Sequence, residues 1–470
     1  MLFNTPLFVA FISIFHVLYG LTFAKNTPRV LLIIIASLIF YGAWDYRFIP
    51  LLMFSGIVDY TVANLMDSTE DQQQRKRLLF ISIATNLGIL GIFKYLNFMI
   101  ESVQASLGWI GLDVSLGTLS IVLPVGISFY TFQSMSYTID VYRGETHARK
   151  SFLPFFATLS FFPQLVAGPI LRARQILPQI ETIPKIEISN IQYGLVLITM
   201  GLVKKTIADL LSAPAQTLFN NPEPLSWIET LTGVLAFAGQ IYGDFSGYSD
   251  IAIGLALILG IKIPLNFNTP YFSVSPVEFW KRWHISLSSW LRDYLYISLG
   301  GNRNNRQIRN VFITMLLGGL WHGAAWTFVA WGAFHGLIIS ATHLLRRTTI
   351  GKWFGNQQSR WLTLCQWLFT FYLICIGWVF FRAESISSAF SIIADLHQPF
   401  STIAATPYAG IILGLVIFSI VMVHVLDHWI IKHKSTLEKR FWWFLPLLIL
   451  GQAFVFMIGE PGHEFIYFQF

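Results

Sequence analysis

The stretch LLGGLWHGAAWTFVAWGAFHG, residues 316–336, consists almost entirely of glycine, alanine, tryptophan, phenylalanine and leucine, yet His322 lies in its middle with no charged neighbour. Ionisable side chains are costly at membrane depth, so they are functional candidates by default. On a helix, the face that carries His322 also carries glycine and alanine. Such small residues leave room beside the imidazole for a neighbouring helix or for a substrate chain.

The whole chain shares this apolar character. Of its 470 residues, 54% are hydrophobic and only 12% are charged, about half the charged fraction of a typical soluble domain. Its mean hydropathy is +0.60. Apolar runs long enough to cross ~30 Å of hydrocarbon recur along the chain. The sequence therefore predicts an all-α polytopic membrane protein, since barrel strands would alternate in short segments.

We expect about 11–13 transmembrane helices within a single membrane-embedded domain that covers residues 1–470, because no loop is long enough for a separate soluble domain. The first apolar run has no basic leader and no small-residue cleavage site, so we interpret it as a retained span and not a signal peptide. The predicted spans are 5–24, 30–45, 48–66, 78–96, 118–140, 152–171, 190–211, 227–243, 247–263, 311–345 (one helix or two), 361–381, 407–426 and 441–458.

Basic residues gather in every second loop, after the first, third and fifth spans. Positively charged loops face the cytoplasm, which places the N-terminus on the outer side of the membrane. Arg172 and Arg174 break this alternation after the sixth span, so a re-entrant or interfacial segment is needed somewhere in the chain. The net charge of +7 therefore indicates orientation and not nucleic-acid binding. The loop cations are Lys25, Arg29, Arg75, Lys76, Arg77, Arg143, Arg149 and Lys150.

Residues 266–310 are the one extended departure from hydrophobicity. Ser275, Pro276 and Glu278 have the spacing of a helix N-terminus with a capping box. A helix from there would be amphipathic, which predicts a segment in the membrane interface. One face would carry Trp280, Trp283, Leu287, Trp290, Leu291 and Tyr294, and the other Lys281, Arg282, Ser286, Ser289, Arg292 and Asp293.

Three further features are candidates for chemistry. His284 lies at the border between the two faces, where it could face a protein cavity or lipid headgroups. His335 is rotated by about 140° from His322 on a straight helix, so the two could not share a metal ion, and we expect His335 to be structural. The segment YGDFSGYSD (242–250) fits either a broken helix that lines a cavity or a turn between spans. Nucleophile elbows, phosphate-binding glycine loops and HExxH motifs are absent from the sequence.

Two of these segments together resemble the membrane-bound O-acyltransferase family: FWKRWHISLSSWLRDYLYISLGGNR (279–303) and LGGLWHGAAWTFVAWGAFHG (317–336). The resemblance implies a bundle of membrane helices around a funnel, with His322 at its constriction as the catalytic residue and His284 as the second motif histidine. Supporting stretches in family order are LPVGISFYTFQSMSYTIDVYRG (123–144), FFPQLVAGPI (161–170), DFSGYSDIAIG (244–254), WVFFRAES (378–385) and FIYFQF (465–470).

The resemblance also implies a reaction. An acetyl group from a cytoplasmic donor, acetyl-CoA or another activated acetyl compound, would reach an exported polysaccharide such as alginate. Periplasmic SGNH-type O-acetyltransferases would assist, and the chain would lie in the bacterial inner membrane. We expect Trp326, Trp283, Asp244 and Arg292 to bind substrate, and we expect no tightly bound cofactor, no metal and no nucleic acid.

Histidine suits this chemistry, because acyl transfer to a hydroxyl needs a base whose pKa lies near the working pH. The donor that would stabilise the oxyanion is open, with His284 as one candidate, and His322 could instead accept the acyl group covalently. D-alanyl transfer to teichoic acid, a flippase for lipid-linked sugars and a scaffold for periplasmic enzymes are the alternatives. The sequence shows no internal repeat, which argues against a transporter.

Overall fold

The computed structural model describes residues 1–22, 24–182, 185–221, 223–349, 351, 359–399, 403–459 and 465–466. All regular secondary structure in these ranges is helical, which confirms the expected all-α class. Among the described residues, six segments are long and apolar enough to cross a bilayer, as a multi-pass membrane protein requires. These are Asn26–Asp67, Gln72–Trp109, Trp326–Leu345, Arg360–Arg382, Ala409–Lys432 and Phe441–Ile458.

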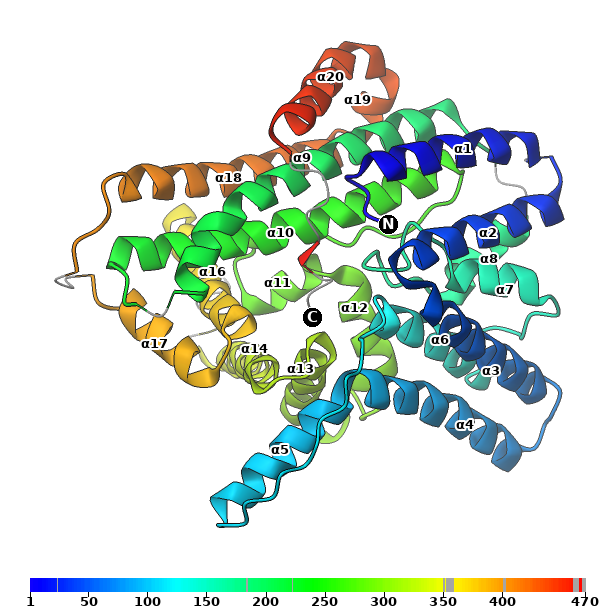
Figure 1. Cartoon of the computed structure of the whole chain (residues 1–470), viewed down its shortest axis with the longest axis horizontal. Helices are drawn as coiled ribbons and strands as arrows, with labels where there is room; N and C mark the ends of the chain where they lie inside the picture. Colours follow the sequence, from blue (N-terminus) through cyan, green and yellow to red (C-terminus); the bar gives the residue numbers. More distant parts are fainter. Residues whose placement is uncertain are drawn as a thin grey trace. The chain divides into compact units, whose positions relative to one another are not determined.

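The chain forms two compact units (Figure 1). Unit 1 comprises Met1–Ile191 and Leu255–Pro264, and unit 2 comprises Gln192–Gly254 and Leu265–Phe470. The helices up to residue 181 belong to unit 1: α1 Pro6–Thr22, α2 Asn26–Asp45, α3 Ile49–Asp67, α4 Gln72–Leu90, the π-helical turn η2 Gly91–Tyr95, α5 Leu96–Trp109, α6 Ile127–Tyr142, α7 Phe152–Leu159 and α8 Ala173–Glu181.

Unit 2 contains most of two 32-residue helices, α9 Ile188–Phe219 and α10 Trp227–Ile258. Its other elements are η3 Pro270–Phe272, α11 Pro276–Arg282, α12 Ile285–Trp290, η4 Leu291–Tyr296, α13 Gln307–His322, α14 Trp326–Leu345, α16 Arg360–Arg382, α17 Ile386–Leu396, α18 Ala409–Lys432, α19 Lys434–Lys439 and α20 Phe441–Ile458.

A buried carboxylate joins α3, α4 and α6 in the core of unit 1. The Asp59 side chain of α3 is fully buried. Ser82 and Asn86 of α4 donate hydrogen bonds to it at 2.5 and 2.8 Å, and Ser134 of α6 donates a third. A buried carboxylate is tolerated only when its oxygens are satisfied in this way. The aspartate therefore fixes how the three helices pack.

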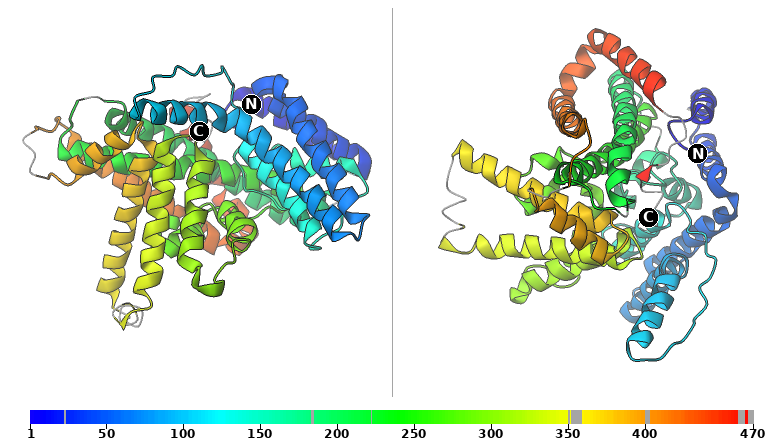
Figure 2. Two further views of the ribbon diagram at one scale, coloured as in Figure 1. Left: turned by 90° about the horizontal axis from the view of Figure 1, so that it is seen from below. Right: turned by 60° about the vertical axis from the view of Figure 1, so that its left-hand side comes forward.

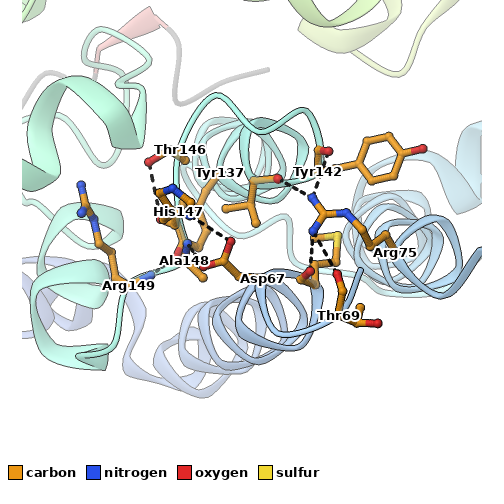
Figure 3. A network of polar contacts seen from close by, with 11 residues as sticks. Asp67, Thr69, Arg75, Tyr137, Tyr142, Thr146, His147, Ala148 and Arg149 are labelled. Carbon is orange, nitrogen blue, oxygen red and sulfur yellow. Dashed lines mark hydrogen bonds and ion pairs between the residues drawn. The ribbon is translucent and has the colours of Figure 1, made fainter. Parts of the chain in front are cut away.

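The start of α4 lies beside the C-terminal ends of α3 and α6 (Figure 3). The Arg75 guanidinium, at the start of α4, donates to the carbonyls of Met66, Val141 and Tyr142 at 2.6, 3.0 and 3.2 Å. These carbonyls belong to the last turns of α3 and α6, where a cation also suits the helix dipole. Arg75 thus joins the C-terminal ends of α3 and α6.

We expect Arg75→Met to loosen this end of unit 1. Hydrogen bonds from a charged group contribute about 1.5–3 kcal/mol, so local opening should increase at least about tenfold. Limited proteolysis of the 68–71 loop measures that opening as a cleavage rate. Arg77→Met is the matched control, because Arg77 is exposed on the same helix. Equal cleavage rates in both variants would contradict the role assigned to Arg75.

The predicted span 118–140 is wrong at its start, because the helix begins only at Ile127. The preceding segment runs back along α5, and both the amide and the carbonyl of Leu119 hydrogen-bond to the Asn97 side chain, at 3.0 and 2.8 Å. Gly126 then adopts a left-handed φ of +77°, where a Cβ would lie 2.7 Å from the Leu165 carbonyl. A side chain at this corner is sterically excluded.

The predicted span 152–171 is also wrong, since α7 has only eight residues. Residues 160–172 that follow are buried without regular structure, in a segment interrupted by Pro163 and Pro169. Irregular backbone at membrane depth must be satisfied by protein groups. The Phe162 amide, for example, donates to Ser37 Oγ at 3.1 Å. Residues 160–172 therefore do not continue α7 into a spanning helix.

The two predicted spans 227–243 and 247–263 form the single helix α10, so YGDFSGYSD is neither a broken helix nor a turn. Its glycines instead permit a close helix crossing. A Cβ at Gly247 would lie 2.7 Å from the Gly201 carbonyl of α9, and one at Gly243 would lie 3.0 Å from the Lys204 carbonyl. The aspartates of the segment face lysines of α9, as described below.

The amphipathic segment departs from its prediction in a similar way. Its N-terminus is confirmed, because Ser275 Oγ accepts a hydrogen bond from the Glu278 amide at 3.2 Å. The expected single helix is wrong, since α11 ends at Arg282 and α12 starts at Ile285. The aromatic stripe does not face lipid, because most of it is buried in unit 2: Trp283, Leu287, Trp290, Leu291 and Tyr294.

The 311–345 segment forms two helices, α13 and α14, which are joined at residues 323–325. The helix α14 packs against both α13 and α16 (Figure 2). Glycines make the α13–α14 contact close, because a Cβ at Gly319 would lie 2.3 Å from the Phe328 carbonyl and one at Gly332 would lie 2.5 Å from the Met315 carbonyl. Gly319, one of the small residues on the helix face of His322, therefore leaves room for the neighbouring helix α14.

Candidate functional site

A strained turn between α11 and α12 positions His284. The backbone of Trp283 is extended, and His284 adopts the left-handed conformation at φ +43° and ψ +55°. This conformation costs a non-glycine residue free energy, and such strain concentrates at functional sites. The Ile285 amide donates to the Asn266 carbonyl at 2.9 Å, which holds the turn in place.

The Asn266 side chain orients the imidazole. Its Oδ1 accepts hydrogen bonds from His284 Nδ1 at 3.2 Å and from Ser286 Oγ at 2.8 Å. Its Nδ2 donates to Ser249 Oγ at 3.1 Å, which fixes the orientation of the amide. The proton of the neutral ring therefore lies on Nδ1, and Nε2 carries the lone pair.

His284 is fully buried and lies outside the candidate spanning helices. Burial lowers the pKa of His284 to about 3, because the charged ring would lose its hydration. The ring is therefore neutral near pH 7. With its proton on Nδ1, it can accept a hydrogen bond at Nε2 but cannot donate one there. If His284 were to donate a hydrogen bond from Nε2 to the oxyanion, its ring proton would have to lie on Nε2, which is the other tautomer.

His322 is the last residue of α13, and its ring is almost completely buried. The helix stops because Gly323 adopts an extended conformation, and a Cβ at Gly323 would lie 2.0 Å from the Phe328 ring. The His322 ring centroid lies 5.1 Å from that of Trp331 and 6.4 Å from that of His284. The structure thus brings the two motif histidines of unit 2 together inside an aromatic enclosure.

His335 occupies a different place in the same aromatic cluster. Its ring is fully buried on α14, and its Nδ1 accepts a hydrogen bond from Trp280 Nε1 at 3.2 Å. A Cβ at Gly377 would lie 2.8 Å from His335 Nε2, so α16 packs directly over the ring. These contacts fit the structural role expected from its position.

The predicted substrate-binding residues do not form one group. Trp283 is fully buried and its ring stacks on that of Phe279, directly beside His284. Trp326 is 56% exposed at the first turn of α14. Arg292 is exposed on η4 and pairs with Asp293 at 2.7 Å. Of these three residues, Trp283 alone adjoins a motif histidine in sequence.

The fourth predicted residue, Asp244, belongs to an ion-pair network inside unit 2. Lys205 Nζ lies 2.8 Å from carboxylate oxygens of both Asp244 and Asp209. The other Asp244 oxygen accepts a hydrogen bond from the Ile466 amide at 2.5 Å, and the Phe465 ring lies 4.6 Å from Lys205 Nζ. The Lys205–Asp244 ion pair thus holds residues 465–466 within unit 2.

A second lysine repeats the arrangement one residue earlier in α9. Lys204 Nζ lies 2.6 Å from oxygens of both Asp250 and Asp427. Tyr242 donates a hydrogen bond to the second oxygen of Asp427 at 2.5 Å. We call the two lysines and their four carboxylates the lysine–aspartate network. It joins α9, α10 and α18, and it ends one residue from Phe245, whose ring lies edge-on to His284 at 4.6 Å.

Sequence reasoning missed Asn266 and Asp427. Asp427 could have been found, because an acidic residue in the apolar run VMVHVLDHWII needs a cationic partner, and Lys204 and Lys205 are themselves surrounded by apolar residues. Asn266 gave no such signal, since an asparagine in a polar segment is ordinary. Its role depends on a backbone turn that the sequence does not show.

We expect Lys205→Met to destabilise unit 2 strongly, because two carboxylates would lose their cation. Removing one partner of a buried pair typically costs about 3–5 kcal/mol. Thermal unfolding in detergent would measure the loss. The double variant Lys205→Met with Asp244→Asn should recover part of the stability, because one unpaired charge disappears with its partner. A double variant less stable than Lys205→Met would contradict this pairing.

The part of the chain that contains both histidines matches a known protein family. A model of MBOAT, the membrane-bound O-acyltransferase family, matches residues 38–385. The chain is 41% identical over 403 residues to "Probable alginate O-acetylase AlgI" of Azotobacter vinelandii, a match that covers 85% of this chain and 78% of that protein.

Two further relatives carry different names. "Peptidoglycan O-acetyltransferase" of Helicobacter pylori is 36% identical over 430 residues, which covers 84% of this chain and 80% of that protein. "Teichoic acid D-alanyltransferase" of Streptococcus thermophilus is 30% identical over 256 residues, which covers 50% of this chain and 61% of that protein.

Proposed function

The chain belongs to the membrane-bound O-acyltransferase family, and on that premise we propose that it transfers acetyl groups to hydroxyl groups of an exported polysaccharide, alginate or a similar polymer. The acetyl group is favoured over D-alanine because the O-acetylating relatives match this chain with higher identity and over more of its length. Formation of an ester separates this activity from a flippase or a scaffold.

One observation carries the assignment of the site. The His284 and His322 rings are both buried, and their centroids lie 6.4 Å apart inside the region that the family model matches. A left-handed backbone turn positions His284, and the C-terminal end of α13 positions His322. Two oriented, buried imidazoles are suited to move a proton during acyl transfer.

In the proposed reaction, His322 acts as the general base. It removes the proton from the attacking hydroxyl as the new ester C–O bond forms and the bond from the acyl carbon to the donor breaks. With an acetyl thioester as donor, that proton passes to the departing thiolate, so the reaction consumes no other reagent. His284 accepts a hydrogen bond at Nε2 and orients the reacting groups.

We propose acetyl-CoA or another activated acetyl compound in the cytoplasm as the donor, and periplasmic SGNH-type O-acetyltransferases as the partners that complete polymer acetylation. The enzyme would then lie in the bacterial inner membrane with its N-terminus in the periplasm. Arg75, in the first turns of α4, and Arg149, in the loop after α6, lie near each other (Figure 3), and their positive charge is typical of cytoplasmic segments, which favours this topology.

We expect His322→Ala to abolish acetylation. Loss of a general base typically lowers the rate by about 10²–10⁴-fold. The measurement is O-acetyl ester on exported polymer, together with label transferred from [¹⁴C]acetyl-CoA in isolated membranes. His397→Ala is the control, because His397 is exposed at the end of α17. It should retain activity at an equal protein level.

Two results would overturn this assignment. Wild-type levels of acetylated polymer in His322→Ala would remove the catalytic role. Labelled acetyl that is trapped on the His322 ring during a single turnover would replace the general base by a covalent carrier.

We expect Asn266 to be a positioning residue for His284. Asn266→Leu should lower kcat about ten- to a hundredfold with little change in KM, because the ring would lose its orientation. In Asn266→Asp, a carboxylate beside Nδ1 would favour the charged ring and raise the pKa of His284. The acidic limb of the activity profile should then move to higher pH. Unchanged kcat in the first variant and an unmoved limb in the second would disprove this role.

A further inference from the structure

An open groove lies along one face of α4 in unit 1, at the start of the candidate membrane span Gln72–Trp109. Its volume is about 680 Å³. The residues that line it follow one another at helical spacing, which places them on a single face of the helix. We call this surface the α4 groove, and its lining residues are Gln73, Lys76, Arg77, Phe80 and Ile81.

The opposite face of α4 is the one that packs inside unit 1. Ser82 and Asn86 hydrogen-bond to the buried Asp59 carboxylate of α3, and Arg75 donates to carbonyls at the ends of α3 and α6. At about 100° per residue, these three α4 residues lie roughly half a turn around the helix from the groove. The α4 groove therefore points away from the helices on which α4 packs.

The polar half of the α4 groove contains two cations. Lys76 and Arg77 are both exposed, and neither forms a hydrogen bond or an ion pair with a described residue. Helix α4 contains no acidic residue, and the Asp71 carboxylate at its N-cap accepts a hydrogen bond from the Gln73 amide at 2.9 Å. An ammonium and a planar guanidinium on adjacent residues suit a phosphate group, which arginine can bind through two hydrogen bonds.

The apolar half of the groove continues the same face toward the middle of the span. Phe80 is 70% exposed, and Ile81 and Leu87 are 49% and 47% exposed. A Cβ added at Gly88 or Gly91 would meet no atom within 4 Å, so the surface beside these side chains is open. The face rises about 16 Å from Phe80 to Gly91, close to the hydrocarbon thickness of one leaflet, which is about 15 Å.

We propose that the α4 groove binds an anionic phospholipid of the phosphatidylglycerol class. The phosphodiester lies between Lys76 and Arg77, and one acyl chain extends along Phe80 and Leu87. The order of the two halves carries the proposal, because exposed cations followed by one leaflet's length of exposed apolar surface match a lipid headgroup and its chain. A zwitterionic headgroup fits less well, since its own ammonium would lie beside the two cations.

Photolabelling of the full-length protein in phosphatidylcholine nanodiscs tests the proposal. The two probes are trace amounts of a phosphatidylglycerol and a phosphatidylcholine that carry the same diazirine on the same acyl chain. Labelling is measured on the tryptic peptide that ends at Lys94, which contains the apolar half of the groove. We expect the anionic probe to label this peptide about tenfold more than the zwitterionic probe, because each cation near the membrane surface favours an anionic lipid severalfold.

Two pairs of variants make the test specific. Lys76→Gln with Arg77→Gln should bring the labelling ratio of the two probes close to one. Arg47→Gln is its control, because Arg47 is an exposed cation at the other end of α3, and it should keep the wild-type ratio. Gly88→Trp should obstruct the chain and lower labelling by the anionic probe severalfold. Gly20→Trp on α1 is the matched control, since a Cβ there also meets no atom within 4 Å.

Equal labelling of the wild type by the two probes would overturn the proposal, and this comparison decides it even where a variant fails to fold. A preference that survives in the Lys76 and Arg77 double variant would place the anionic lipid elsewhere. Loss of the preference in Arg47→Gln would reveal a general effect of net charge.

The source of the phosphate group is tested separately. Inorganic phosphate should leave labelling by the anionic probe unchanged relative to chloride at the same ionic strength, because a lipid that is also held by its chain is not displaced. Suppression by phosphate alone would show that the two cations take phosphate groups from solution, and this result would also overturn the proposal.

Discussion

The pairing of two adjacent lysines with four aspartates is the constraint on which unit 2 depends. Lys204 and Lys205 are both almost completely buried, and an isolated ammonium at that depth would cost several kcal/mol or more. Each lysine is therefore bracketed by two carboxylates, and the carboxylates come from α9 itself, α10 and α18. The relative positions of these helices are fixed by electrostatics in addition to apolar contact. The same network holds residues 465–466, and it ends next to the ring that adjoins His284.

The two motif histidines are held by unlike means, and the difference suits unlike roles. His284 lies in a strained turn in which Asn266 hydrogen-bonds to both the His284 ring and the Ile285 amide, so the tautomer and the orientation of the ring are determined together. The His322 ring lies among other rings, which are those of Trp321, Trp331, Phe381 and His284. An aromatic enclosure of this kind excludes water, which strengthens electrostatic interactions with a reacting group.

Composition and apolar periodicity were enough to predict the helical membrane class and the candidate spans Ala409–Lys432 and Phe441–Ile458, because a span is a property of about 20 consecutive residues. They failed where tertiary contacts override local pattern. The glycines at 243 and 247 look like helix breakers, but they allow α10 to approach α9. The aromatic stripe of 280–294 looks like a lipid-facing surface, but it is mostly buried because His284 interrupts the helix and turns the stripe inward. The two motif histidines were singled out by resemblance to a known family, whereas Asn266 was identified only from the fold.

The location of Asp427 has a consequence for biogenesis. Lys204 and this partner are separated by 223 residues (427 − 204), so the ribosome needs roughly 10–45 s to supply the second carboxylate at about 5–20 residues per second. During that interval α9 and α10 carry an incomplete set of charges. The final packing of α9 and α10 must therefore follow the emergence of α18 from the ribosome. Assembly of unit 2 is thus a late event in the synthesis of the chain.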